Sequence, residues 1–469
     1  MRLQSPSRSF GEAMFAQAQL GDRRRTRRLV ELTDLLCKHP GGSLPEKLKS
    51  PKDLKALYRL CACAAVTHAA LVSSVRQAVL GELDKHGDDV LVLHDGTELD
   101  YSTHKSLTGQ LGQVGRGLKQ GYLCHNSLVV KPEGREVLGL VNQILHCRVR
   151  VAKKETLPQR RARASRESRL WLLGTQVLPA DRRLIDVADQ GADTFEFLEH
   201  EIHSGRRFVI RAHHARKASA GHEPSSATST VQSYARSLPA LGGRVIDVAS
   251  QPGKGRRPAR PARRARLLIS AAAILVHPPH AKHGEHGREP LPMWVVRVWE
   301  PQPPKGVEPI EWFLLTNEPV TSLADADRVI GWYQTRWVIE EFHKAIKTGC
   351  RVEGLQFTAT KRLEPMIALL STVATTLLNL RAASQLPDAQ TRRANSLIDS
   401  AYVEVLSAWR YDEVRNLTVH EFFFALARLG GHQNRRGDKR PGWLILWRGW
   451  TTLQAMLEGA ETNRHRKCG

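Results

Sequence analysis

Two adjacent glutamates, Glu340 and Glu341, stand in the stretch YQTRWVIEEFHKAIK, which is otherwise crowded with cations and aromatic residues. On an α-helix with about 100° per residue, Glu340 falls in the middle of a polar face and Glu341 falls at its margin. The apolar residues take the opposite side of that helix: Val338, Ile339, Phe342, Ala345 and Ile346. The pattern predicts one helix from Tyr333 to Lys347 on which Glu340 is the glutamate that does chemistry.

Four side chains surround Glu340 on this polar face: Tyr333, Arg336, Lys344 and Lys347. A salt-bridged surface helix would explain part of the pattern, because Glu340 and Lys344 form a favourable i,i+4 pair. It would not explain why a tyrosine and three cations line up around one acid. A carboxylate that holds a divalent metal ion beside a phosphodiester would explain it, since the cations would bind the neighbouring phosphates.

Two aspartates follow predicted buried strands. The apolar run Val90–Leu93 leads to Asp95, and the run in RLIDVADQG leads to Asp189. The carboxyl ends of strands are where α/β domains often place functional groups. A strand followed by Asp is, taken alone, more often a capping residue. A functional role for the two aspartates is favoured more strongly because Glu340 supplies a third acid.

The charge balance points to a polyanion as partner. The chain has 469 residues, with 70 Lys+Arg against 47 Asp+Glu, a net charge of +23. Nucleic acid is the first candidate for such an excess, and a generally arginine-rich proteome is the alternative. Seven cysteines without a CxxC pair indicate free thiols in a reducing cytoplasm rather than disulfides or a zinc site. No apolar window approaches a membrane span, so we expect a soluble cytoplasmic protein.

The first 80 residues or so read as helices. In LGDRRRTRRLVELTDLL, Asp22 is a plausible N-cap, and arginines fill the first turns of the helix that follows: Arg23, Arg24, Arg25, Arg27 and Arg28. Arginines clustered near a helix start can bind phosphates. DNA contact is favoured over a solvated charged face, because only one acid lies nearby.

The middle of the chain alternates strands with helices. The stretches expected as strands are 90–95, 121–131, 136–149, 184–188 and 206–214, with a polar helical stretch at 153–178. The first three of these strands suggest an antiparallel meander. Residues 213–310 then read as a β-rich insertion that carries a basic run at 253–266 and a His-rich loop at 277–286. The loop is interpreted as solvated, because Pro and Gly between its histidines give no rigid metal spacing. From about 322 the chain reads as helical.

The spacing of Tyr333, Arg336, Glu340 and Lys347 resembles the YREK signature of bacterial insertion-sequence transposases of the family numbered four. The similarity extends along the chain through LGDRRRTRRLV, HDGTELDYS, VADQGADTFEFL, PPKGVEPIEWFLLTNEPV and the tail ALARLGG…GWLILWRGWTTLQ. Some positions depart from the family pattern: Gly96 stands in place of Thr, and Gln190 and Gly191 in place of Arg and Glu, while Asp193 is retained.

The resemblance implies an RNase H-like α/β catalytic domain with a mixed sheet and a β-rich insertion, flanked by helical regions. It places a helical DNA-binding domain at residues 1–75 and the catalytic domain at 76–368. The insertion would take about 213–320, and a helical dimerisation region would follow at 369–469.

The implied function is cut-and-paste DNA transposition through end nicking, hairpin formation and strand transfer. The resemblance assigns two Mg²⁺ ions, replaceable by Mn²⁺, to Asp95, Asp189 and Glu340. The DNA-binding residues would be Tyr333, Arg336, Lys344, Lys347, Trp312 and Arg211, together with the N-terminal arginines. Trp312 would stack on a base that leaves the duplex. The partners would be double-stranded DNA, as transposon ends and target, and a second copy of the chain in a homodimer. The enzyme would act at the nucleoid in the bacterial cytoplasm, away from membranes.

Two other classes remain open. One is a host nuclease of the same fold, such as a junction resolvase, although such enzymes are usually far shorter. The other is a catalytically inactive DNA-binding inhibitor of transposition, which would need a lost carboxylate or a missing N-terminus.

Overall fold

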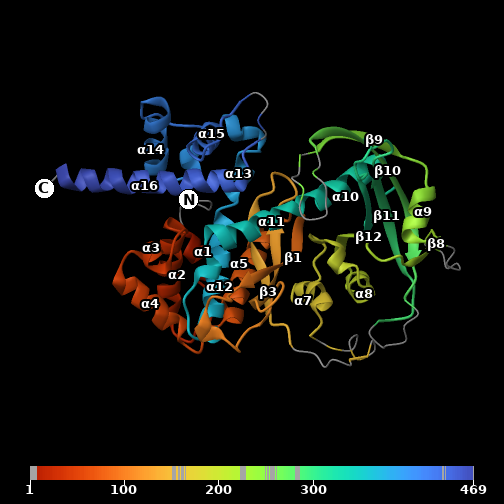
Figure 1. The fold of residues 1–469 in the computed structure, drawn as a ribbon, viewed down its shortest axis with the longest axis horizontal. Coiled ribbons are helices and arrows are strands. Elements are labelled where there is room, and N and C mark those ends of the chain that lie inside the picture. Colours follow the sequence, from red (N-terminus) through yellow and green to blue (C-terminus); the bar gives the residue numbers. More distant parts are fainter. Residues whose placement is uncertain are drawn as a thin grey trace. The chain divides into compact units, whose positions relative to one another are not determined.

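The computed structural model describes residues 8–149, 155–156, 159, 163, 165–221, 229–248, 250, 253, 259, 261–279, 286–435, 438 and 440–467. The chain forms two compact units. The first unit consists of Met1–Asp88, Gly96–Val149 and Trp337–Gly469, and the second of Asp89–Asp95 and Arg150–Arg336. Both units are therefore discontinuous in the sequence. Figure 1 shows the elements in chain order.

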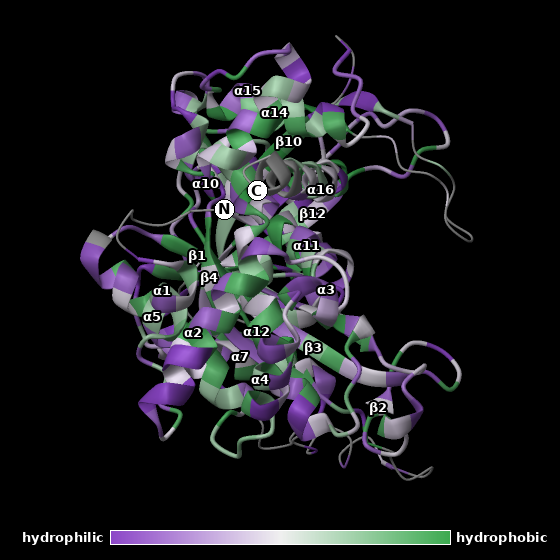
Figure 2. Cartoon of the chain, turned by 90° about the vertical axis from the view of Figure 1, so that its left-hand side faces the viewer, coloured by the Kyte–Doolittle hydropathy of each residue, from purple (hydrophilic) through white to green (hydrophobic). Residues whose placement is uncertain are grey.

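Five helices begin the first unit: α1 (Phe10–Phe15), α2 (Arg23–Lys38), α3 (Leu44–Leu48), α4 (Pro51–Cys61) and α5 (His68–His86). Asp22 caps α2 as predicted, since its side chain accepts a hydrogen bond of 2.8 Å from the Arg24 N–H. Leu29, Leu32 and Leu36 are fully buried along one side of α2. Figure 2 shows the hydrophilic residues of α2 in purple. The helix and the N-cap predicted from the sequence are confirmed.

Antiparallel strands and a C-terminal set of helices complete the first unit. Strand β3 (Gln120–Val130) pairs with both β2 (Gly112–Gln113) and β4 (Val137–His146), so the predicted β3–β4 hairpin is confirmed. The helices that follow in the chain are α11 (Trp337–Lys344), α12 (Thr360–Thr376), α13 (Asn379–Ala383), α14 (Ser400–Tyr411), α15 (Val419–Leu429) and α16 (Trp443–Lys467). Helix α12 packs against α5 and β4.

The expectation that no apolar window approaches a membrane span is wrong: one segment around α12, Thr360–Ala383, is long and apolar enough to cross a membrane by length and composition alone. In its most apolar window, 83% of the residues are buried inside the fold. This is the environment of a core helix.

The second unit is built on a mixed sheet. Its strands lie in the order β1 (Val90–Asp100, the part up to Asp95), β5 (Leu184–Ala188), β6 (Arg207–Arg211), β12 (Glu311–Thr316), β11 (Leu291–Trp299), β10 (Arg263–Val276), β7 (Lys217–Ala220) and β8 (Ser229–Thr230). Strand β9 (Gly242–Val248) also pairs with β10. The pairs β1–β5 and β5–β6 are parallel, and the remaining pairs are antiparallel.

The described helices of the second unit include α7 (Leu170–Gln176), α8 (Phe195–His203), α9 (Val231–Ser237) and α10 (Leu323–Thr335). Helix α9 packs on β10 and β11 of the insertion (Figure 1). Phe197, Phe208 and Ile210 are fully buried in the core between α8 and the sheet. A large mixed sheet with helical N- and C-terminal regions confirms the predicted fold class, and it is consistent with an RNase H-like fold.

Several sequence expectations differ from the structure or lie outside it. The predicted helical stretch 153–178 contains one short helix, α7, preceded by a single 3₁₀ turn at Glu167–Arg169, within its described part. Most of the basic run 253–266 before β10, and residues 280–285 of the His-rich loop, lie outside the described residues. Helix α5 continues through residues 75 and 76. The proposed domain limits stay a prediction.

The remaining short turns are 3₁₀ turns at Lys105–Leu107, Gln190–Ala192, Val352–Gly354, Pro387–Gln390 and Ala394–Ser396.

Candidate functional site

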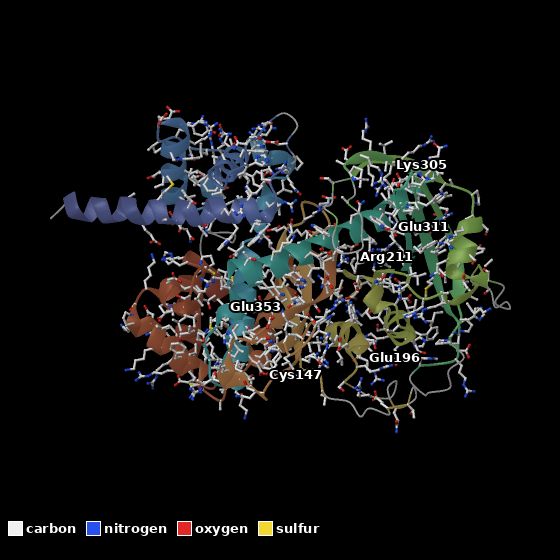
Figure 3. All side chains as sticks on the ribbon, viewed as in Figure 1. Cys147, Glu196, Arg211, Lys305, Glu311 and Glu353 are labelled. Carbon is white, nitrogen blue, oxygen red and sulfur yellow. The ribbon has the colours of Figure 1, made fainter. Side chains whose placement is uncertain are left out.

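The two aspartates singled out from the sequence lie where the parallel pairing of β1 and β5 ends in the second unit: β5 stops at Ala188, just before Asp189, whereas β1 continues past Asp95 to Asp100, so the expected end of that strand at Asp95 is wrong. In the parallel pair β1–β5, His94 is the register partner of Ala188. Asp95 and Asp189 each come directly afterwards, on strands that lie about 4.8 Å apart. Strand β6 continues the same edge, because Ala188 pairs with Ile210 and Arg211 follows. Two carboxylates and a guanidinium thus follow one another along the edge, and Arg211 is labelled in Figure 3.

Trp312 reaches this edge from the opposite direction. Strand β12 runs antiparallel to β6 with Leu314 opposite Arg211, so β12 begins where β6 ends. The predicted apolar strand residues 313–315 are buried, whereas Trp312 itself is partly exposed. Its ring meets the Tyr333 ring edge-on, with 5.8 Å between the ring centroids. The structure therefore brings Trp312 and Tyr333 together.

Helix α10 carries Tyr333 near its end, and Arg336 follows directly after the helix. Arg336 Nη1 donates a hydrogen bond of 3.0 Å to Asp95 Oδ2, and both side chains are largely buried. Burial raises the pKa of Tyr333 above its ordinary value, although the charges of Arg336 and Arg211 act in the opposite direction. The Tyr333 phenol consequently stays protonated and can donate a hydrogen bond. No pattern in the sequence indicated the Arg336–Asp95 pair.

Asp189 also has a capping role, which was the plain alternative for a strand-end aspartate. Its Oδ1 accepts a hydrogen bond of 2.8 Å from the Gly191 N–H in the turn that follows β5. A Cβ atom on Gly191 would lie 2.2 Å from the Trp171 ring. Trp171 thus fills the space that a side chain at position 191 would need, which accounts for that departure from the family pattern. At Gly96, by contrast, a Cβ would meet nothing closer than 3.5 Å.

Asp193, retained from the family pattern, is a structural anchor. It is buried and accepts hydrogen bonds of 2.7 Å from the N–H groups of His213 and His214 and from Arg216 Nε. These contacts hold the chain that leaves β6 towards the insertion. The sequence alone does not show whether Asp193, four residues after Asp189, is a structural anchor or a metal ligand.

The two adjacent glutamates, Glu340 and Glu341, have different environments within the first unit. Glu341 is buried and forms an ion pair with Arg381, whereas Glu340 lies partly exposed in the first turn of α11. The residues assigned to the apolar face are all buried, as predicted: Val338, Ile339, Phe342, Ala345 and Ile346. The structure gives Glu341 a packing role and leaves Glu340 on the polar side.

The single helix predicted for 333–347 is wrong in two places. Helix α10 ends at Thr335, and α11 starts only at Trp337, after Arg336. From Ala345 to Gly349 the backbone is a π-helix, with a hydrogen bond of 2.8 Å from the Cys350 N–H to the Ala345 carbonyl. A π-turn rotates less per residue than an α-turn. The position inferred for Lys347 from 100° steps therefore does not hold.

The two lysines of the signature have partners within the first unit. Lys344 Nζ lies 5.5 Å from the ring centroid of Trp337, whose side chain is half exposed. Lys347 Nζ lies 3.6 Å from Glu353 Oε1, and Glu353 is labelled in Figure 3. Glu353 also accepts a hydrogen bond of 2.9 Å from the Asp100 N–H. A phosphate approaching Lys347 would compete with this carboxylate.

The five N-terminal arginines fall into two groups. Arg23, Arg24 and Arg27 are exposed at the start of α2 beside a groove of about 740 Å³. Arg25 donates to the Leu20 carbonyl over 2.9 Å, and Arg28 contacts Glu31 at 2.9 Å. The first group is available to a partner, and the second group holds the domain together.

A metal ion would have carboxylate oxygens as ligands here, the type that Mg²⁺ prefers. Asp95 and Asp189 fit that chemistry, because a carboxylate oxygen that accepts one hydrogen bond keeps a further lone pair. In the part of the chain that the structure describes, no group of three or more His, Cys, Asp or Glu side chains is close enough to hold a metal ion. Glu340 belongs to the first unit and the two aspartates to the second.

Residues 7–66 match the family model described as transposase DNA-binding. The match covers α1 to α4, including the arginine-rich start of α2. It supports a transposase, and it supports DNA as the partner of the N-terminal helices.

Proposed function

We propose that this chain is a DDE transposase of the insertion-sequence family numbered four, which excises and inserts a DNA element by cut-and-paste transposition. One observation carries the proposal: Asp95 and Asp189 directly follow His94 and Ala188, the last register pair of the adjacent parallel strands β1 and β5. Together with the transposase DNA-binding match at residues 7–66, this pair supports phosphodiester chemistry on DNA over DNA binding alone.

The carboxylates of Asp95, Asp189 and Glu340 would hold the catalytic metal. Bound Mg²⁺, or Mn²⁺ in its place, would lower the pKa of an attacking water and stabilise charge on the phosphate. Arg336 orients Asp95 through its hydrogen bond. The Tyr333 phenol, held in its protonated form, can donate to a phosphate oxygen.

Cations in both units would bind the DNA backbone near the cut. Arg211 lies beside Asp189 on the same sheet edge, and Lys344 and Lys347 follow Glu340 in the first unit. Trp312 offers a partly exposed ring for a base that leaves the stack during hairpin formation. The exposed arginines of α2 would contact the transposon end.

The remaining parts of the proposal concern assembly and place. A homodimer would pair two transposon ends, with the helices after residue 369 as the dimerisation region. The enzyme would act on target DNA at the bacterial nucleoid. The structure does not favour an inactive inhibitor, because the three acids and the N-terminal helices are present together in one chain.

A cleavage assay tests the proposal. The substrate is a labelled duplex that carries the element's own terminal inverted repeat, incubated with Mg²⁺, and the products are resolved as nicked strand, hairpin and joined target. We expect all three products from the wild type and none from Asp189→Asn. Specific binding without any cleavage would favour an inhibitor, and cleavage without joining would favour a host nuclease. Either result would overturn the proposal.

A further inference from the structure

A fully buried polar network lies directly behind the edge that carries Asp95 and Asp189. Its members are His94, Asp186, Thr175, Glu201 and Arg206, each no more than 1% exposed. None of them faces solvent, and none has a role in the reaction proposed above. All belong to the second unit.

The Asp186 carboxylate joins the network. His94 Nε2 lies 2.6 Å from Asp186 Oδ1, which links β1 to β5 by side chains as well as by the sheet. Arg206 Nε donates to Asp186 Oδ2 over 2.9 Å, and Thr175 Oγ1 donates to the same oxygen over 3.3 Å. Arg206 also donates to the Pro179 carbonyl. Of the bonds to Asp186, the one from His94 connects the two strands that lead to the candidate catalytic aspartates.

The network and the aspartates lie on opposite faces of the sheet. Asp186 is the register partner of Val92, so His94, two residues further along β1, projects to the same face as Asp186. Asp95 follows His94 and projects to the other face. Asp189 is three residues after Asp186 in extended backbone, with φ −79° and ψ −170°, and it also projects to that other face. The hydrogen bond between His94 and Asp186 thus joins β1 to β5 on the face of the sheet opposite to Asp95 and Asp189.

The charges in the network balance. Burial would raise the pKa of Asp186, but the charge of Arg206 and the hydrogen bond from His94 outweigh it and hold that pKa below its ordinary value. Burial and the nearby Asp186 carboxylate raise the pKa of Glu201 well above its ordinary value, which favours its neutral form. The Arg206 guanidinium thus compensates the buried Asp186 carboxylate, as a buried ion pair must to be tolerated.

We propose that His94 and Asp186 are positioning residues that set the separation of the Asp95 and Asp189 carboxylates and so preform the metal-binding pair. A buried bond between strand ends restricts their sliding and splaying more than backbone pairing alone does, because β1 and β5 pair here over only Val90–His94 and Leu184–Ala188. The inference rests on the proposed function for the identity of the ligand. It assigns a role to two residues that touch neither metal nor DNA.

Mn²⁺ binding to the full-length protein tests this role without any cleavage step. Free Mn²⁺ is measured by its electron paramagnetic resonance signal during titration of wild type, His94→Leu, His94→Asn and His94→Gln. Loss of a group that supports a metal ligand typically weakens metal binding about 10- to 100-fold. We expect that loss in the Leu and Asn variants. The Gln variant, whose amide nitrogen can occupy the place of Nε2, should recover most of the affinity.

Thr175→Val is the matched control. It removes another buried hydrogen bond to Asp186, but that bond comes from α7 and does not link β1 to β5. We expect a melting temperature lowered about as much as in the His94 variants, with Mn²⁺ affinity within about twofold of wild type. Equal loss of affinity in Thr175→Val and His94→Asn, or unchanged affinity in both His94→Leu and His94→Asn, would overturn the positioning role.

Failure of the proposed function gives a different result. If the wild type binds Mn²⁺ through Asp95 and Asp189 but cuts no DNA, the transposase proposal falls and the His94 series still decides the positioning role. Should Asp95→Asn bind Mn²⁺ as tightly as wild type, the aspartate pair is not the metal site and both proposals fall.

Discussion

Arg336 donates a hydrogen bond to Asp95 across 3.0 Å, so the arginine and the first acid of the candidate site form an ion pair within the second unit. Arg336 can therefore have two roles. It can hold the Asp95 carboxylate in place, and it can bind a phosphate that approaches the metal site. The two roles predict different DNA binding when the arginine is replaced.

Replacement of Arg336 by Ala should weaken binding to transposon-end DNA and lower the slope of log K against log salt concentration by about one unit, since one phosphate contact is lost. Filter binding or fluorescence anisotropy at several salt concentrations measures it. Arg328→Ala is the control, because Arg328 lies on α10, which ends just before Arg336, but pairs with Asp325. An unchanged slope in the Arg336 variant would mean that Arg336 binds no phosphate and serves only to hold Asp95.

Neutral replacement of each acid, in Asp95→Asn, Asp189→Asn and Glu340→Gln, should abolish cleavage while end binding stays within about threefold of wild type. The carboxylates hold metal and make no favourable contact with phosphates, which is why binding survives. Gel-shift and cleavage assays on the same preparations separate the two properties. Cleavage by Glu340→Gln at the wild-type rate would remove Glu340 from the site.

Glu341 provides the contrast within the same helix. Its buried carboxylate pairs with Arg381, so Glu341→Gln should lower the free energy of unfolding by about 1–3 kcal/mol. Below its lowered melting temperature the variant should still cut DNA. A denaturant titration and a cleavage assay at a permissive temperature test both halves of this expectation.

The two groups of N-terminal arginines should respond differently to mutation. Removing the exposed group, in a variant with Arg23, Arg24 and Arg27 replaced by Ala, should abolish specific end binding with a melting temperature near that of wild type. Replacing Arg25 and Arg28 should instead lower stability, because these side chains bond to the Leu20 carbonyl and to Glu31. Calorimetry and DNA-binding assays on both variants decide. The assignment fails if the two variants lose binding and stability alike.

Neutralising Glu353 should strengthen DNA binding. Glu353→Gln keeps an oxygen for the Asp100 N–H but removes the charge that faces Lys347. Partly exposed ion pairs are worth at most about 1 kcal/mol, so we expect up to about a fivefold gain in affinity. The double variant Glu353→Gln with Lys347→Ala should show no gain. Weaker binding in the single variant would mean that Glu353 orders Lys347 for DNA and does not compete with it.

Trp312→Ala should nick the transposon end at nearly the normal rate but accumulate nicked product, since hairpin formation requires a base to leave the stack. Base stacking on an aromatic ring is worth about 1–3 kcal/mol, and Trp312→Phe should restore part of the rate. The fluorescence of 2-aminopurine near the transposon end should also rise less on complex formation. Equal slowing of nicking and hairpin formation would assign Trp312 to the core.

Local pattern predicted the strands but not their pairing. An apolar run followed by an acid located Asp95 and Asp189; the structure confirms the strand before Asp189, whereas the strand that holds Asp95 continues to Asp100. That His94 pairs with Ala188, 94 residues further on (188 − 94), depends on tertiary packing and leaves no local signal. The transposase family and the DNA partner inferred from the sequence gain support from the N-terminal match, while the metal, the dimer and the site roles stay predictions.

The errors in the signature helix have the same origin. Neither Gly nor Pro marks the break at Arg336, and the π-turn from Ala345 has no sequence signature that distinguishes it from an α-turn. Glu341 is buried because Arg381 supplies a partner 40 residues away (381 − 341). Helical periodicity could place Glu341 at a margin, but it could not supply that partner.

Burial of the apolar segment Thr360–Ala383 within the first unit has a consequence for the cell. While the chain emerges from the ribosome, this stretch is as apolar as a membrane anchor, and only its neighbours in the finished fold hide it. A substitution that loosens those neighbours would expose a surface for chaperones, membranes and other copies of the chain. Damage to the first unit should therefore appear in cells as insoluble or degraded protein before it appears as slow chemistry.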